Sequence, residues 1–245
     1  MVLGLAATIA LAWIYLVRAA ASMNGMTAEA QMHAAMGMAD MRAWGLGDWF
    51  GLFVMWDVMM AAMMLPSAAP VIVLVLGVYR RRADRQARSA AVTFVLGYLL
   101  AWTGFSVAAS AAQLGLHRAA LLAPDMSLAS PVVSGVILLA VGVYQWLPLK
   151  STCLTHCQSP FGFITQHWRE GSFGGLVMGL RHGMYCVGCC WLLMIVLFVV
   201  GVMNLVWVAA LTGFVLIEKL VRGGTHVGRA VGLAAAAWGL YLMLP

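Results

Sequence analysis

Five cysteines in two tight groups are the residues of this 245-residue sequence best suited to chemistry. The first group is Cys153 and Cys157, and the second is Cys186, Cys189 and Cys190. A lone buried cysteine is usually only a small apolar side chain, whereas grouped thiolates are soft ligands for Cu(I), zinc or an iron–sulfur cluster. The groups lack the paired Cys-x2-Cys hooks of a zinc ribbon, so copper, zinc and iron–sulfur all remain open. We expect metal or redox chemistry at these thiols.

The second cysteine group belongs to a longer stripe of ligand-type side chains. Residues three or four apart share one face of a helix, and this spacing joins His182 and Met194 to the three thiols between them. Cys153 and Cys157 would share a face in the same way. If both groups hold one ion through bonds near 2.3 Å, a sulfur of the first should lie about 4 Å from a sulfur of the second.

An acidic residue inside an apolar segment marks a second candidate site. Asp57 lies about two turns into an expected span, where a carboxylate costs about 2.5–3.5 kcal/mol on insertion scales and needs a partner. No Lys or Arg is near it on its own helix, so we expect a cation or a proton as that partner. Met60 and Met64 lie three and seven residues further on, on the same helical face. Methionines alone would indicate packing, but beside an acid they favour a transition-metal site.

A Met- and His-rich tract and one glutamate supply further candidate ligands. Met32, His33, Met36 and Met38 resemble the Met- and His-rich tracts that capture copper in oxidising compartments; the alternative is an interfacial helix with its methionines on the apolar side. Glu218 is followed directly by a lysine, and adjacent residues do not face each other on a helix. We therefore expect each to serve a different partner, with Glu218 as a buried partner or a ligand near the cysteines.

The elements that position these residues are apolar helices. The chain is 64% hydrophobic and only 9% charged, against roughly a quarter charged in soluble domains, which excludes a soluble domain. With about 20 apolar residues per span, the sequence predicts an all-α, polytopic transmembrane bundle that forms one domain over residues 1–245. The seven expected spans are 2–17, 50–79, 89–113, 131–149, 183–201, 204–221 and 229–244. Residues 2–17 could alternatively be a signal peptide, but no basic residue precedes the apolar run.

Basic residues set the expected orientation. Five arginines crowd residues 80–88, and the positive-inside rule places that connection in the cytoplasm. Alternation then puts the N-terminus in the cytoplasm, the C-terminus in the periplasm, and eleven of the 14 Lys and Arg on the cytoplasmic side. Two long connections result: an external Met- and His-rich loop near 19–48 and a cytoplasmic, cysteine-containing loop near 150–172.

At these motifs the sequence resembles a bacterial family of predicted metal-binding integral membrane proteins, built around a domain of unknown function. The matching pieces are Trp56-Asp57-x-Met59-Met60-Ala61-Ala62-Met63-Met64-x-Pro66, Tyr144-Gln145-x2-Pro148-Leu149-Lys150-x2-Cys153-Leu154-x2-Cys157, Gly183-x2-Cys186-x-Gly188-Cys189-Cys190-Trp191-x2-Met194 and Glu218-Lys219. They extend from the second expected span to the sixth. The resemblance implies metal binding and supplies no reaction.

The leading interpretation is a multi-pass protein of the bacterial inner membrane that binds a soft metal, most readily copper. It would transport the metal inward or deliver it to a membrane metalloenzyme or a metallochaperone. The first alternative is a membrane oxidoreductase or electron-transfer subunit whose cysteines form a redox centre, and the second is a structural subunit of a membrane complex. No nucleotide-binding loop or hydrolase elbow favours an enzyme, and no nucleic-acid motif is present.

Overall fold

The computed structural model describes the backbone of residues 2–35, 45–81, 87–123, 126–221 and 223–244, and the side chains of these ranges except residues 2 and 24–35. The described ranges are helical and contain no strand, which confirms the all-α prediction. The helices in these ranges are α1 (Val2–Ala35), α2 (Leu46–Arg81), α3 (Ala87–Arg118), α4 (Pro131–Tyr144), α5 (Pro148–Gln158), α6 (Pro160–His167), α7 (Gly171–Val200), α8 (Leu205–Leu220) and α9 (Gly224–Met243).

Several helices have the length and composition of membrane spans. In the described ranges α1, α2, α3 and α7 meet this test alone, and α4 with α5 adds a fifth span if the pair, bent by 64°, is counted as one. Helices also occupy the last two expected spans, but α8 and α9 do not reach the same length or apolarity. The structure is therefore compatible with a membrane protein of four or five candidate spans, fewer than the seven expected.

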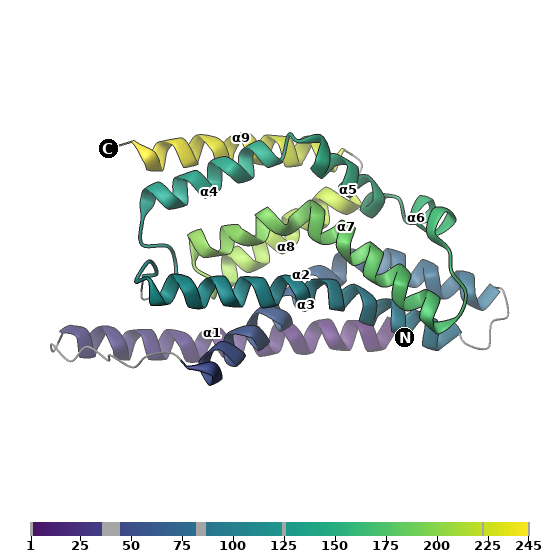
Figure 1. Ribbon diagram of the computed structural model, residues 1–245, viewed down its shortest axis with the longest axis horizontal. Coiled ribbons are helices and arrows are strands. Elements are labelled where there is room, and N and C mark those ends of the chain that lie inside the picture. Colours follow the sequence, from purple (N-terminus) through teal and green to yellow (C-terminus); the bar gives the residue numbers. More distant parts are fainter. Residues whose placement is uncertain (1, 36–44, 82–86, 124–125, 222, 245) are drawn as a thin grey trace.

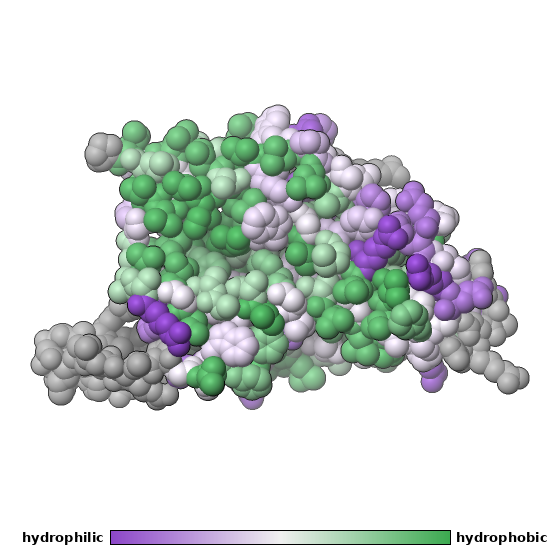
Figure 2. All heavy atoms as spheres, in the orientation of Figure 1, coloured by the Kyte–Doolittle hydropathy of each residue, from purple (hydrophilic) through white to green (hydrophobic). Residues whose placement is uncertain are grey.

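The helices run back and forth between two ends of an elongated bundle (Figure 1). Helices α2, α3, α7 and α8 form the centre, α4 and α9 pack together along one side, and α1 lies on the opposite side. The face in view carries a broad apolar surface, with hydrophilic residues gathered mainly toward the end where α6 lies (Figure 2). Such an apolar surface between polar ends is the pattern expected of a chain solvated by lipid.

Glycines set the closest helix contacts, as expected where small residues let backbones approach in membrane bundles. On α7, Gly175 and Gly179 lie directly against the α3 backbone, where an added Cβ would overlap the carbonyl oxygens of Ala90 and Phe94. The same device joins α4 to α9, because a Cβ on Gly239 would lie 2.6 Å from the Gly135 carbonyl oxygen. Gly175 and Gly179 thus form the close contact between α3 and α7.

Prolines shape the segment that carries the first cysteine group. A proline has no N–H and disfavours helical backbone in the residue before it, so a helix ends before Pro148 and another before Pro160. The Ser159 hydroxyl caps α6 by accepting a hydrogen bond from the Gly162 amide at 3.3 Å. The stretch 150–172, expected as a loop, therefore contains most of α5, all of α6 and the start of α7. Packing of α5 against α7 brings the two cysteine groups together.

Candidate metal centre

The two cysteine groups meet between α5 and α7. Cys157 Sγ lies 4.0 Å from Cys189 Sγ, the approach predicted from the sequence, and Cys189 Sγ lies 3.2 Å from Cys190 Sγ. Both contacts are too long for a disulfide bond of about 2.05 Å, and all five cysteines are free thiols. Two ligand sulfurs about 4 Å apart can share one ion through bonds near 2.3 Å. Cys157 and Cys189 thus have a separation suited to a soft metal.

Cys153 approaches α7 at a glycine. An added Cβ on Gly188 would lie 2.9 Å from Cys153 Sγ, so only glycine leaves room for this sulfur. The Tyr144 hydroxyl of α4 donates a hydrogen bond to the Gly188 carbonyl. Cys153 is partly exposed, whereas Cys157 is buried, and the two therefore line an outer and an inner part of the same contact.

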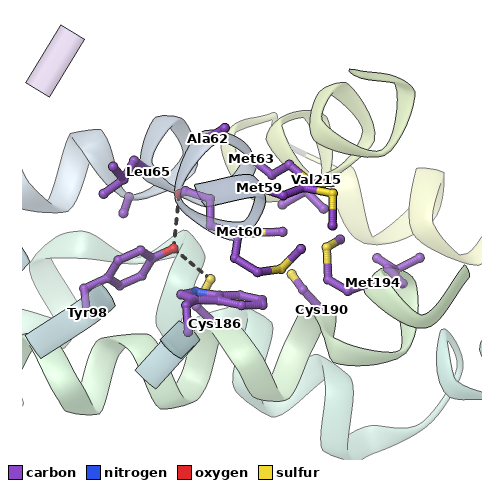
Figure 3. Packing of buried hydrophobic residues seen from close by; sticks show 14 of the residues in the cluster. Met59, Met60, Ala62, Met63, Leu65, Tyr98, Cys186, Cys190, Met194 and Val215 are labelled. Carbon is purple, nitrogen blue, oxygen red and sulfur yellow. Dashed lines mark hydrogen bonds between the residues drawn. The ribbon is translucent and has the colours of Figure 1, made fainter. Parts of the chain in front are cut away.

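Cys186 has polar partners that the sequence analysis did not identify. Lys219 Nζ donates hydrogen bonds to Cys186 Sγ at 2.8 Å and to the Ser67 hydroxyl at 3.3 Å. The Tyr98 hydroxyl lies 3.0 Å from the same sulfur and donates to the Met64 carbonyl at 3.1 Å (Figure 3). The buried ammonium can stabilise negative charge on this sulfur. Lys219 lies in the last turn of α8, yet the residue is only 5% exposed and its ammonium points into the bundle.

Thioethers extend the sulfur-rich region toward α2. Met60 and Met63 of α2 lie opposite Cys190 and Met194 of α7, and Val215 of α8 packs beside them (Figure 3). All four sulfur-bearing residues are fully buried, at 0% exposure. Thioethers are soft, neutral ligands suited to Cu(I). Met64, the other predicted ligand of this helix, is also fully buried.

Asp57 has a hydrogen-bond partner on α3, and its expected cation or proton stays a prediction. Its Oδ1 accepts a hydrogen bond of 2.8 Å from the Thr103 hydroxyl of α3, and its side chain is only partly buried. Among the described residues, Asp57 forms no ion pair. A neighbouring hydroxyl therefore satisfies part of the carboxylate, and the predicted link between Asp57 and the methionines stays a prediction.

His182 and Glu218 take structural partners. His182 is buried among the rings of Phe94, Tyr98 and Phe163, at centroid distances of 6.0, 5.9 and 4.9 Å, and its Nδ1 has no hydrogen-bond partner in the described residues. Glu218 Oε1 forms a 2.6 Å ion pair with Lys150 Nζ, and both side chains are at most 2% exposed. The expectation that Glu218 and its neighbouring lysine serve different partners is confirmed.

Some predicted ligands lie outside the described residues. This applies to the side chains of Met32 and His33 and to the whole of Met36 and Met38. Among the described side chains, no three His, Cys, Asp or Glu residues are arranged as a ready site for one ion. What the structure brings together is a pair of thiols from two helices, with further thiols and thioethers beside it.

Lys150, Lys219 and Tyr98 were not identified as partners from the sequence, for two different reasons. Lys150 and Lys219 were noticed as charges but placed at the membrane surface, because a lysine near the end of an apolar run usually extends its ammonium to the polar boundary. Tyr98 gave no signal, since an aromatic residue in an apolar helix is typical of packing.

Comparison with known proteins supplies one match. Residues 53–242 match the model of a protein family described as PpoB2, copper chaperone, which is more than three quarters of the chain. No curated protein and no solved structure matches the chain significantly.

Proposed function

Because the chain belongs to the PpoB2 copper chaperone family, we propose that it holds Cu(I) between α5 and α7 and delivers it to a copper enzyme at the bacterial inner membrane. The observation that carries this proposal is the 4.0 Å approach of Cys157 Sγ to Cys189 Sγ. Copper is the cargo in this function.

The chemistry of the neighbouring side chains supports Cu(I) over harder ions. Thiolates and thioethers prefer Cu(I), whereas magnesium, calcium and manganese prefer oxygen ligands. Cys190 is adjacent to the thiol pair, and Met194 and Met60 lie next to Cys190 (Figure 3). A set of alternative sulfur ligands lets an ion change partners in small steps, as a protein that must release its cargo requires.

Delivery is favoured over tight storage by the composition of the site. Two thiols supply strong ligands, whereas the thioethers are neutral and bind more weakly. The α4–α5 bend keeps Cys153 partly exposed, so a partner could reach the outer sulfur without unfolding the bundle. In the proposed orientation this end faces the cytoplasm, together with the arginine-rich connection of residues 80–88.

The proposal is tested by copper loading in cells. A bacterial strain that lacks the chain and makes a membrane copper enzyme is grown in copper-poor medium, and the copper content of the purified enzyme is measured. We expect the wild-type chain to restore that content and Cys157→Ser with Cys189→Ser to fail. Thr152→Ser, an exposed position on the same helix, is the matched control and should behave as wild type.

Two results would contradict delivery. Full copper loading by the double cysteine variant, present at wild-type level in the membrane, would remove the thiol pair from the function. Loss of a disulfide-dependent activity with unchanged copper in the enzyme would instead favour the oxidoreductase alternative. Added copper should bypass the need for the chain if its role is delivery.

A further inference from the structure

Two histidines near the cysteine site, one on α5 and one on α6, lie close together. The ring centroids of His156 and His167 are 6.3 Å apart. His156 stacks on Tyr185 at 4.2 Å with an angle of 14° between the rings, and His167 stacks on Phe163 at 5.0 Å and 24°. Both imidazoles are therefore held in fixed orientations by aromatic neighbours.

The hydrogen bonds of these rings define which nitrogen is available. His156 Nδ1 lies 2.9 Å from the Thr152 carbonyl oxygen, and His167 Nδ1 lies 3.0 Å from the Phe163 carbonyl oxygen. A carbonyl oxygen can only accept, so in each ring Nδ1 carries the proton and donates it. Each neutral ring then has an unprotonated Nε2. Metal-binding histidines commonly have this arrangement, in which one ring nitrogen donates a hydrogen bond to the protein and the other binds the metal.

The separation of the rings suits one shared ion. With metal–nitrogen bonds near 2.0–2.1 Å and about 1.1 Å from each nitrogen to its ring centre, an ion held between two imidazoles places their centroids up to about 6.4 Å apart. The observed 6.3 Å lies within this limit. The two rings are therefore close enough to share one ion, and imidazole nitrogens suit copper.

One histidine of the pair adjoins the thiol site in the chain. Cys157 directly follows His156 in the chain and is the thiol that approaches Cys189. A surface pocket of about 180 Å³ is lined by His156 together with Thr155, Ser159, Gly162, Phe163 and Gln166. Both histidines are partly exposed, and His156 lines this pocket, so an ion in the pocket can reach His156 without crossing the apolar core.

We propose that His156 and His167 form a second copper site, an outer station that holds Cu(I) through two Nε2 atoms next to the Cys157–Cys189 pair. This proposal deepens the delivery function and rests on it for the identity of the ion. Cu(I) moves between the two stations by ligand exchange without a change of oxidation state. When the ion replaces the hydrogen of a thiol, the proton leaves to water in the pocket.

The outer site is tested with purified protein in detergent, free of metal and of oxygen, titrated with Cu(I) in competition with a Cu(I)-specific chelator. We expect wild type to bind one copper at sulfur and one more at nitrogen. His156→Gln with His167→Gln should lose the second copper and keep the first. His226→Gln, an exposed histidine of α9, is the matched control and should keep both.

X-ray absorption at the copper edge identifies the ligands at each loading. The second equivalent should add imidazole scattering in wild type, and the double histidine variant should lack it. Each single variant should lose that scattering too. His167→Phe, which keeps an aromatic ring against Phe163, should also lose it. These variants test the site if the double variant does not fold. Unchanged imidazole scattering in all folded histidine variants would overturn the outer site, as would a wild-type protein that shows none.

The outcomes separate this proposal from the delivery function. If Cys157→Ser with Cys189→Ser removes the sulfur-bound copper and leaves the nitrogen-bound copper, both stations are supported. If the cysteine variant changes nothing while the histidine variant loses its copper, the thiol station fails and the histidine site stands.

Discussion

Several charged side chains in this bundle have a specific partner on another helix. Lys219 contacts Cys186, and Asp57 accepts from Thr103. Buried polar groups are costly unless they are hydrogen-bonded or paired, so these contacts explain how an apolar chain tolerates them. A buried charge of this kind can serve folding alone, or it can also serve copper binding.

For Asp57, an experiment can distinguish a role in folding from a role in copper binding. Asp57→Asn removes the charge but keeps an oxygen that accepts from Thr103, so we expect an inserted, folded protein. If the carboxylate serves copper, the variant should bind less of it, and Asp57→Leu should do the same. Copper content after anaerobic purification is the measurement.

Thr103→Val is the matched control for Asp57. It removes the hydroxyl donor and leaves the carboxylate charge in place, so we expect its copper content to stay near wild type. If Asp57→Asn and Asp57→Leu keep full copper content, Asp57 is a hydrogen-bonded polar group with no part in copper binding.

Helix contacts hold the cysteine groups at their separation. Helix α7 carries three of the five cysteines and lies directly against α3 through glycines. Gly179→Ala should destabilise the protein by about 1–3 kcal/mol, as overpacking of a tight contact does, because the new Cβ would overlap the Phe94 carbonyl. The thermal unfolding midpoint in detergent measures the effect.

Gly104 on α3 provides the control for the glycine prediction. Nothing lies within 4 Å of a Cβ added there, so Gly104→Ala should be neutral or stabilise by up to about 1 kcal/mol, since alanine favours helix. Equal midpoints for the two variants would show that the α3–α7 contact is looser than the structure has it.

The ion pair between α5 and α8 makes a second prediction at the scale of elements. Glu218→Gln leaves the Lys150 ammonium buried without its counter-charge, and breaking such a pair costs about 3–5 kcal/mol. Replacing both residues by methionine should recover much of that loss, because an apolar pair needs no compensation. Thermal unfolding of the two variants checks this; a single variant as stable as wild type would mean that water already reaches Lys150.

The sequence predicted contacts within helices better than contacts between them. Spacings of three and four correctly placed the α7 thiols on one buried face of their helix. The partners of Cys186 come from α3 and α8, and no single-helix pattern contains that information. The helices within residues 150–172 were missed because prolines at both starts and several polar residues resemble a loop.

Several helices begin or end at the end of the molecule where α6 lies. In Figure 1 the ends of α2 and α8 and the starts of α7 and α9 lie toward the same end as α6. Arg80 and Arg81 close α2, so from the positive-inside rule we predict that this end faces the cytoplasm. The number of spans that cross the bilayer decides where the C-terminus lies.

Reporter fusions test this orientation. A reporter inserted between Arg80 and Arg88 should be active in the cytoplasm, and one after Pro245 should be active in the periplasm, if all seven apolar segments cross. An alkaline phosphatase and a fluorescent protein at the same positions serve as each other's control. A periplasmic signal from the first position would reverse the orientation, and a cytoplasmic signal from the second would mean that an even number of segments crosses.

The most direct test of copper binding between α5 and α7 is X-ray absorption at the copper edge on protein loaded with one equivalent of Cu(I). We predict sulfur neighbours at about 2.3 Å, with fewer sulfurs or less copper in Cys157→Ser and also in Cys189→Ser, since each thiol comes from a different helix. Copper bound without sulfur, or full copper content with unchanged sulfur scattering in both variants, would contradict a shared site.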